Sequence, residues 1–202
     1  YDMMGYAYTL SEKMKLPVLM RVVTRLAHSR AGVEVADIRE ENQLKPDHER
    51  AHWVLLPGNA RKQYLDLVEK QEELEESSSK SPYNYVEGLN PEYDYEFGVI
   101  ACGIGYNYVK EADTDGCHIP VLKISQYPLP AEEIRTMAEC CGHVLVVEDG
   151  QPFVEEQVKA ILSSDYEIKG RLTGTLPRTG ELTPDNVGEA IGWGVKRPFG
   201  KP

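Results

Sequence analysis

Apolar runs alternate with helix-like segments along the second half of the chain, and this alternation restricts the fold more than any other feature. We expect strands at four runs rich in β-branched residues, 97–102, 121–125, 143–148 and 166–170. Helices are expected after each strand, at 103–112, 130–141, 152–162 and 184–193. Connections of this length join parallel strands through right-handed crossovers. The order predicts an α/β fold: a three-layer α/β/α domain with a mainly parallel sheet over about residues 83–194.

The first 24 residues predict one more helix and one more strand. Apolar side chains recur on one face of a helix over residues 1–15. Residues 17–24 are apolar enough for a strand that is buried on both faces. Such a strand needs neighbours for its backbone groups, and the sequence offers none before Tyr1. Because the chain also lacks an initiator methionine, we expect it to be a piece of a larger protein.

The following segment, up to residue 82, is expected to be a connector that contains one helix. Charged residues crowd it as far as Trp53, with little periodicity. A helix with a weak apolar stripe and an acidic face is expected from Pro57 to Ser79. Residues 83–95 are rich in tyrosines and turn-forming residues, so we expect loops there, either pinned onto a sheet edge or stacked on a ligand.

Charge and cysteine content exclude several functions. A net charge of -11 without any long Lys/Arg block argues against binding to nucleic acid. No apolar run approaches the roughly 20 residues of a membrane span, and no signal peptide opens the chain, so we expect a cytoplasmic protein without a membrane partner. The cysteines contain no C-x-x-C spacing, which predicts reduced thiols and no metal site; they are Cys102, Cys117, Cys140 and Cys141.

Gly103 and Gly105 lie between a predicted strand and a predicted helix, where phosphate-binding turns occur. Tyr108 replaces the third glycine of a G-x-G-x-x-G motif, and no acidic residue ends the next strand. We therefore favour a tight turn, in which Gly105 permits close packing, over a dinucleotide site. Docking of an anion or a partner chain at this turn remains an alternative.

Two adjacent carboxylates, Glu148 and Asp149, follow the third of these strands. They suit acid/base work or cation binding, but no His or Lys accompanies them in the sequence. We favour a charged turn that caps the next helix, with Asp149 in the N-cap region ahead of Pro152.

Arg25, His28 and Ser29 are the best functional candidates. They directly follow the predicted strand at residues 17–24, and open α/β sheets place their ligand sites at the carboxyl ends of strands. An arginine suits a carboxylate or a phosphate, and a histidine exchanges protons near neutral pH. A hydrogen-bonded exit loop explains the same three residues equally well.

Two motifs and several shorter segments match a known family when they are taken together. T-R-L-A-H-S stands at residues 24–29, and V-V-E-x-x-x-P-F-x-E-E-Q stands at residues 146–157. The shorter segments are 10–21, 56–61, 81–84, 98–106, 127–130 and 176–182. In this combination the chain resembles the alpha subunits of indolepyruvate ferredoxin oxidoreductases over nearly its whole length.

The resemblance implies a parent enzyme that oxidatively decarboxylates indolepyruvate or other aryl 2-oxoacids to acyl-CoA and reduces ferredoxin. Its cofactors would be thiamine diphosphate, magnesium and 4Fe-4S clusters, and its partners coenzyme A, ferredoxin and a beta subunit. Residues 1–30 would end a pyrimidine-type thiamine domain, residues 31–82 would form the connector, and residues 83–202 would form a transketolase C-terminal-like domain.

The same resemblance implies that the chain carries no catalytic residue and binds none of these cofactors alone. The catalytic Glu of the family lies upstream of the matched part, and its G-D-G…N motif and cluster cysteines lie downstream. Arg25 would then recognise a carboxylate or phosphate near the substrate or a domain interface, while His28 and Ser29 would form hydrogen bonds. A non-catalytic module that forms a homodimer, and a nucleotide-binding domain that uses Gly103 and Gly105, are the alternatives.

Overall fold

A computed structural model of the chain describes residues 1–41, 43, 48–113 and 119–192. Cys117, Trp193 and the end of the predicted third domain, 193–202, lie outside the described residues. The chain divides into two compact units, Tyr1–Glu73 and Leu74–Pro202, which we describe separately.

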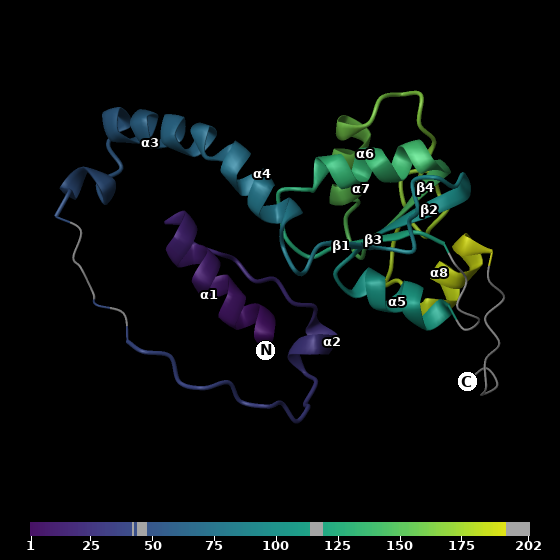
Figure 1. Ribbon diagram of the computed structural model, residues 1–202, viewed down its shortest axis with the longest axis horizontal. Coiled ribbons are helices and arrows are strands. Elements are labelled where there is room, and N and C mark those ends of the chain that lie inside the picture. Colours follow the sequence, from purple (N-terminus) through teal and green to yellow (C-terminus); the bar gives the residue numbers. More distant parts are fainter. Residues whose placement is uncertain (42, 44–47, 114–118, 193–202) are drawn as a thin grey trace. The chain divides into compact units, whose positions relative to one another are not determined.

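The second unit is built on a five-stranded sheet with the strand order β1-β3-β2-β4-β5 (Figure 1). Its strands are β1 (Tyr85–Glu87), β2 (Tyr95–Cys102), β3 (Val121–Ile124), β4 (Cys141–Val147) and β5 (Ile168–Lys169). Strand β1 pairs antiparallel with β3, whereas the other three pairings are parallel. The α/β prediction with a mainly parallel sheet is therefore confirmed, but the loops expected at 83–95 include a strand that the sequence analysis missed.

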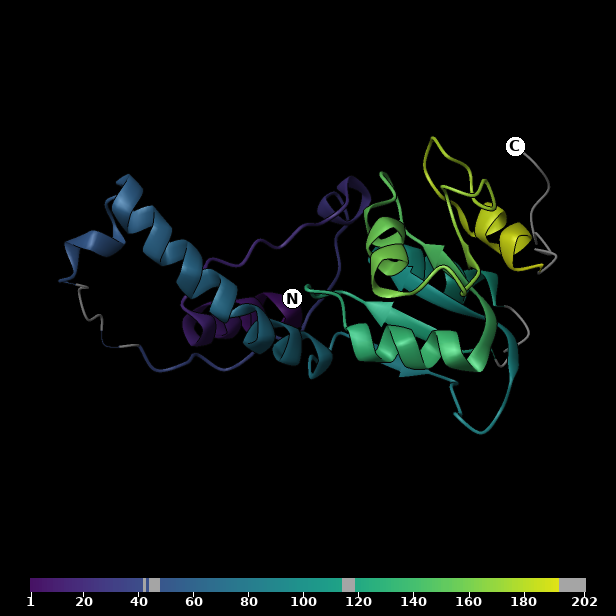
Figure 2. The same ribbon diagram turned by 90° about the horizontal axis from the view of Figure 1, so that it is seen from above.

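Helices cover both faces of this sheet (Figures 1 and 2). Helices α6 (Ala131–Cys140) and α7 (Phe153–Ile161) contribute to one apolar cluster, while α5 (Ile104–Ala112) and α8 (Pro184–Ile191) contribute to the other. The three-layer α/β/α prediction is confirmed for this unit.

Strand β2 shows why the strands of the second unit are apolar throughout. Ile100 faces the cluster of α6 and α7, whereas Val99 and Ala101 face the cluster of α5 and α8. All three side chains are fully buried. Strands that are covered on both faces give continuous apolar runs, which is the signal that the sequence carries.

The first unit contains helices but no strand among its described residues. Its elements are α1 (Asp2–Met14), α2 (Thr24–Ala27), η1 (Arg50–His52) and α3 (Pro57–Glu69), and α4 (Gln71–Ser79) crosses into the second unit. The helix expected over residues 57–79 is thus two helices, separated at Lys70.

The prediction of a buried strand at residues 17–24 is wrong. These residues form no ladder, and the Leu19 side chain is 92% exposed. A strand requires partners for its N–H and C=O groups, and the described residues offer none here. The apolar character of the segment therefore does not produce a strand within this chain.

A search of the described residues finds no helix with the length and apolarity to cross a membrane.

Candidate functional site

The carboxyl ends of the parallel strands form the natural place for a site in the second unit. The chain leaves β2 toward α5 on one face, whereas it leaves β3 and β4 toward α6 and α7 on the other. The loop after β2 and the loops after its two neighbours, β3 and β4, thus lead to opposite faces of the sheet. Open α/β sheets bind ligands in the crevice between loops that separate in this way. We call the loops that follow β2, β3, β4 and β5 the carboxyl edge.

Gly103 and Gly105 form a tight turn at the centre of this edge. Gly103 has a φ of 53°, a conformation that favours glycine, and its N–H donates to the carbonyl of Ile124 at 3.2 Å. A Cβ on Gly105 would lie 2.6 Å from the carbonyl oxygen of Val147, so only glycine lets α5 pack this closely on β4. This close packing agrees with the tight-turn interpretation, and no further contact among the described residues supports a nucleotide site.

The loop after β3 is held by Asn84, a residue that the sequence analysis did not single out. Its Oδ1 accepts the N–H groups of Ser125 at 2.7 Å and Gln126 at 2.9 Å. Its Nδ2 donates to the Gln126 carbonyl and to Oγ of Ser78, both at 2.9 Å. The Ser78 hydroxyl donates to the carbonyl of Gln126 or of Pro128. Asn84 and Ser78 are buried, so these two side chains fix the course of the loop.

The loop fixed in this way presents an aromatic side chain to solvent. Tyr127 is 51% exposed and lies edge-to-face with Phe153, which is 56% exposed, with ring centroids 6.0 Å apart. Phe153 begins α7, so the pair joins the loops after β3 and β4. The sequence gives no sign of this pair, because the two residues are 26 positions apart (153 − 127).

Glu148, rather than Asp149, caps α7. Its two carboxylate oxygens accept the N–H groups of Val154 and Glu155, each at 2.8 Å. Burial raises the pKa of Glu148, although these hydrogen bonds act in the opposite direction. The capping role predicted for this turn is therefore confirmed, but the prediction of Asp149 as the capping residue is wrong.

Asp149 instead contributes to a cluster around Arg171. The Arg171 side chain is 1% exposed and donates to the carbonyl of Glu148 at 3.0 Å, to Oδ1 of Asp149 at 3.2 Å and to the carbonyl of Gly180 at 3.1 Å. The same Oδ1 accepts the N–H of Leu182 at 3.3 Å. Both carboxylates are thus engaged in holding loops, which disfavours a role for this pair in acid/base catalysis.

Arg25, His28 and Ser29 lie in the first unit, in or directly after α2. All three are exposed, and Oγ of Ser29 donates to the carbonyl of Leu26 at 2.8 Å. They do not follow a buried strand, because residues 17–24 form none. The argument that a ligand site lies at the carboxyl end of such a strand is therefore wrong. The three residues do lie together, within one short helix and its exit.

The described residues do not fit a metal or an iron–sulfur cluster. No group of three or more His, Cys, Asp or Glu side chains among them is arranged to hold a metal ion. Cys102 and Cys141 are buried, and burial raises the pKa of Cys102 and raises that of Cys141 to about 11. Buried, protonated thiols are poor ligands. The part of the chain that the structure describes therefore offers no ligand set for a magnesium ion or a cluster.

The fold of this chain is found in an enzyme of the 2-oxoacid:ferredoxin oxidoreductase class. The solved 2-oxoglutarate:ferredoxin oxidoreductase from Magnetococcus marinus, with 2-oxoglutarate, coenzyme A and succinyl-CoA bound, superimposes with a TM-score of 0.50 and 17% sequence identity. The match covers 69% of this chain and 24% of that enzyme's chain. At this identity the likeness establishes the fold alone.

The sequence comparisons are more specific. Indolepyruvate oxidoreductase subunit IorA is 38% identical over 94% of this chain in Methanothermobacter thermautotrophicus, 36% over 98% in Archaeoglobus fulgidus and 33% over 98% in Pyrococcus horikoshii. No family model matches the chain. The predicted resemblance is confirmed: the chain is a homologue of part of indolepyruvate oxidoreductase subunit IorA, and it spans about a third of the length of these relatives, 31–32%.

Proposed function

We propose that this chain functions as part of an indolepyruvate ferredoxin oxidoreductase. The reaction would be the oxidative decarboxylation of indolepyruvate or another aryl 2-oxoacid to an acyl-CoA, with reduction of ferredoxin. The observation that supports it is the 33–38% identity to subunit IorA over nearly the whole chain. Thiamine diphosphate, magnesium, 4Fe-4S clusters and a beta subunit belong to the same proposal, as does a cytoplasmic location.

Within this enzyme the chain would serve assembly rather than chemistry. The charged groups at the carboxyl edge support this role, because Glu148, Asp149 and Arg171 are used to hold loops. Residues 83–202 would form the transketolase C-terminal-like domain, residues 31–82 a connector and residues 1–30 the end of a thiamine domain. The groups that bind cofactors would come from other parts of the enzyme.

The intact enzyme that contains this chain provides the test. Indolepyruvate and coenzyme A should together support ferredoxin reduction, which is measured by absorbance, and omission of either should abolish it. The isolated chain should give no heat with thiamine diphosphate and magnesium in calorimetry. Tight binding by the isolated chain would show that the assignment of its domains is wrong.

Arg25 is proposed to recognise a carboxylate or phosphate near the substrate or at a domain interface, assisted by hydrogen bonds from His28 and Ser29. Arg25→Ala in the intact enzyme should raise the KM for the 2-oxoacid or coenzyme A about tenfold or more, the effect expected for a charge-assisted hydrogen bond. Arg30→Ala, which removes an exposed arginine close by, is the matched control. Equal kinetics for both variants would exclude the role of Arg25.

A further inference from the structure

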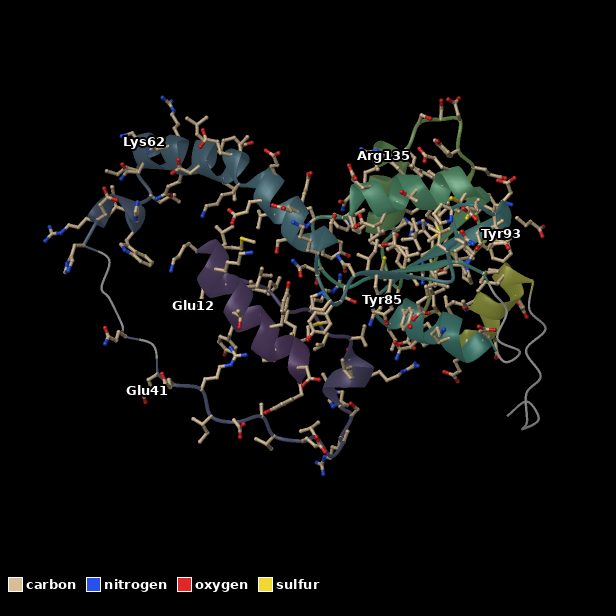
Figure 3. All side chains as sticks on the ribbon, viewed as in Figure 1. Glu12, Glu41, Lys62, Tyr85, Tyr93 and Arg135 are labelled. Atoms are coloured by element: carbon tan, nitrogen blue, oxygen red, sulfur yellow. The ribbon has the colours of Figure 1, made fainter. Side chains whose placement is uncertain are left out.

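We draw no further inference here: the strongest candidate, the exposed apolar surface patch of α3 at Tyr64, Leu65 and Val68 (Figure 3 shows α3 with its side chains), carries none, because nothing in the structure shows what covers it.

Discussion

Replacement of Asn84 by alanine should destabilise the second unit strongly. Asn84 is 7% exposed, and its Oδ1 satisfies the N–H groups of Ser125 and Gln126 in the loop after β3. Alanine leaves both donors without this partner, and each part-buried donor that loses its acceptor costs about 1–2 kcal/mol. We therefore expect Asn84→Ala to lower the free energy of unfolding by about 2–4 kcal/mol.

Urea unfolding of the whole chain, followed by circular dichroism, measures this loss. Asn90→Ala is the matched control, because Oδ1 of the exposed Asn90 accepts one N–H, that of Glu92, at 3.1 Å. The control should lose less than about 1 kcal/mol. Amide hydrogen exchange adds a local readout, since the N–H groups of Ser125 and Gln126 should lose protection in Asn84→Ala and keep it in Asn90→Ala. If both variants have the same stability, the Asn84 cluster does not fix the loop and the reasoning fails.

Three further substitutions test the helix cap at Glu148, the close packing at Gly105 and the lowered pKa of His143. Glu148→Ala removes the acceptor of two backbone N–H groups at the start of α7 and should cost about 2 kcal/mol, whereas Glu156→Ala in the same turn should cost almost nothing in the same unfolding assay. Gly105→Ala forces a Cβ to within 2.6 Å of the Val147 carbonyl and should cost about 1–3 kcal/mol; Gly58→Ala, which meets open space, should be neutral or stabilising by thermal melting. Burial lowers the pKa of His143, so the unfolded state binds more protons below about pH 6.5 and stability should fall as the pH drops below that value. His143→Gln should make the free energy of unfolding depend less on pH in this range. An unchanged slope would show that His143 does not cause the loss of stability at low pH.

The sheet could be predicted where strands are covered on both faces. Val99, Ile100 and Ala101 are buried by helices on either side, and that environment requires an unbroken apolar run. Strand β1 escaped prediction because it is three residues long and none of its side chains is fully buried. The segment 17–24 shows the converse: apolar composition predicts a strand, but pairing depends on partners that the local sequence does not specify.

The candidate site could be predicted only in part for a similar reason. Gly103 and Gly105 stand where a strand meets a helix, and a turn with a positive φ at Gly103 favours glycine. The local pattern therefore identifies the turn, even though its contacts with Ile124 and Val147 are distant in the sequence. Asn84 acts on backbone groups 41 and 42 residues away, and Arg171 acts on one that is 23 residues away. No local pattern marks such a residue, because its partners become neighbours only when the sheet has formed.

A chimera tests the central claim most directly. The segment of Methanothermobacter thermautotrophicus subunit IorA that matches this chain, 31% of its length, would be replaced by the chain, and the assembled enzyme assayed for indolepyruvate-dependent ferredoxin reduction. Membership in this enzyme predicts activity within about tenfold of the parent, together with the same requirement for coenzyme A. A chimera that assembles with normal cofactor content but does not turn over indolepyruvate would contradict the proposed function.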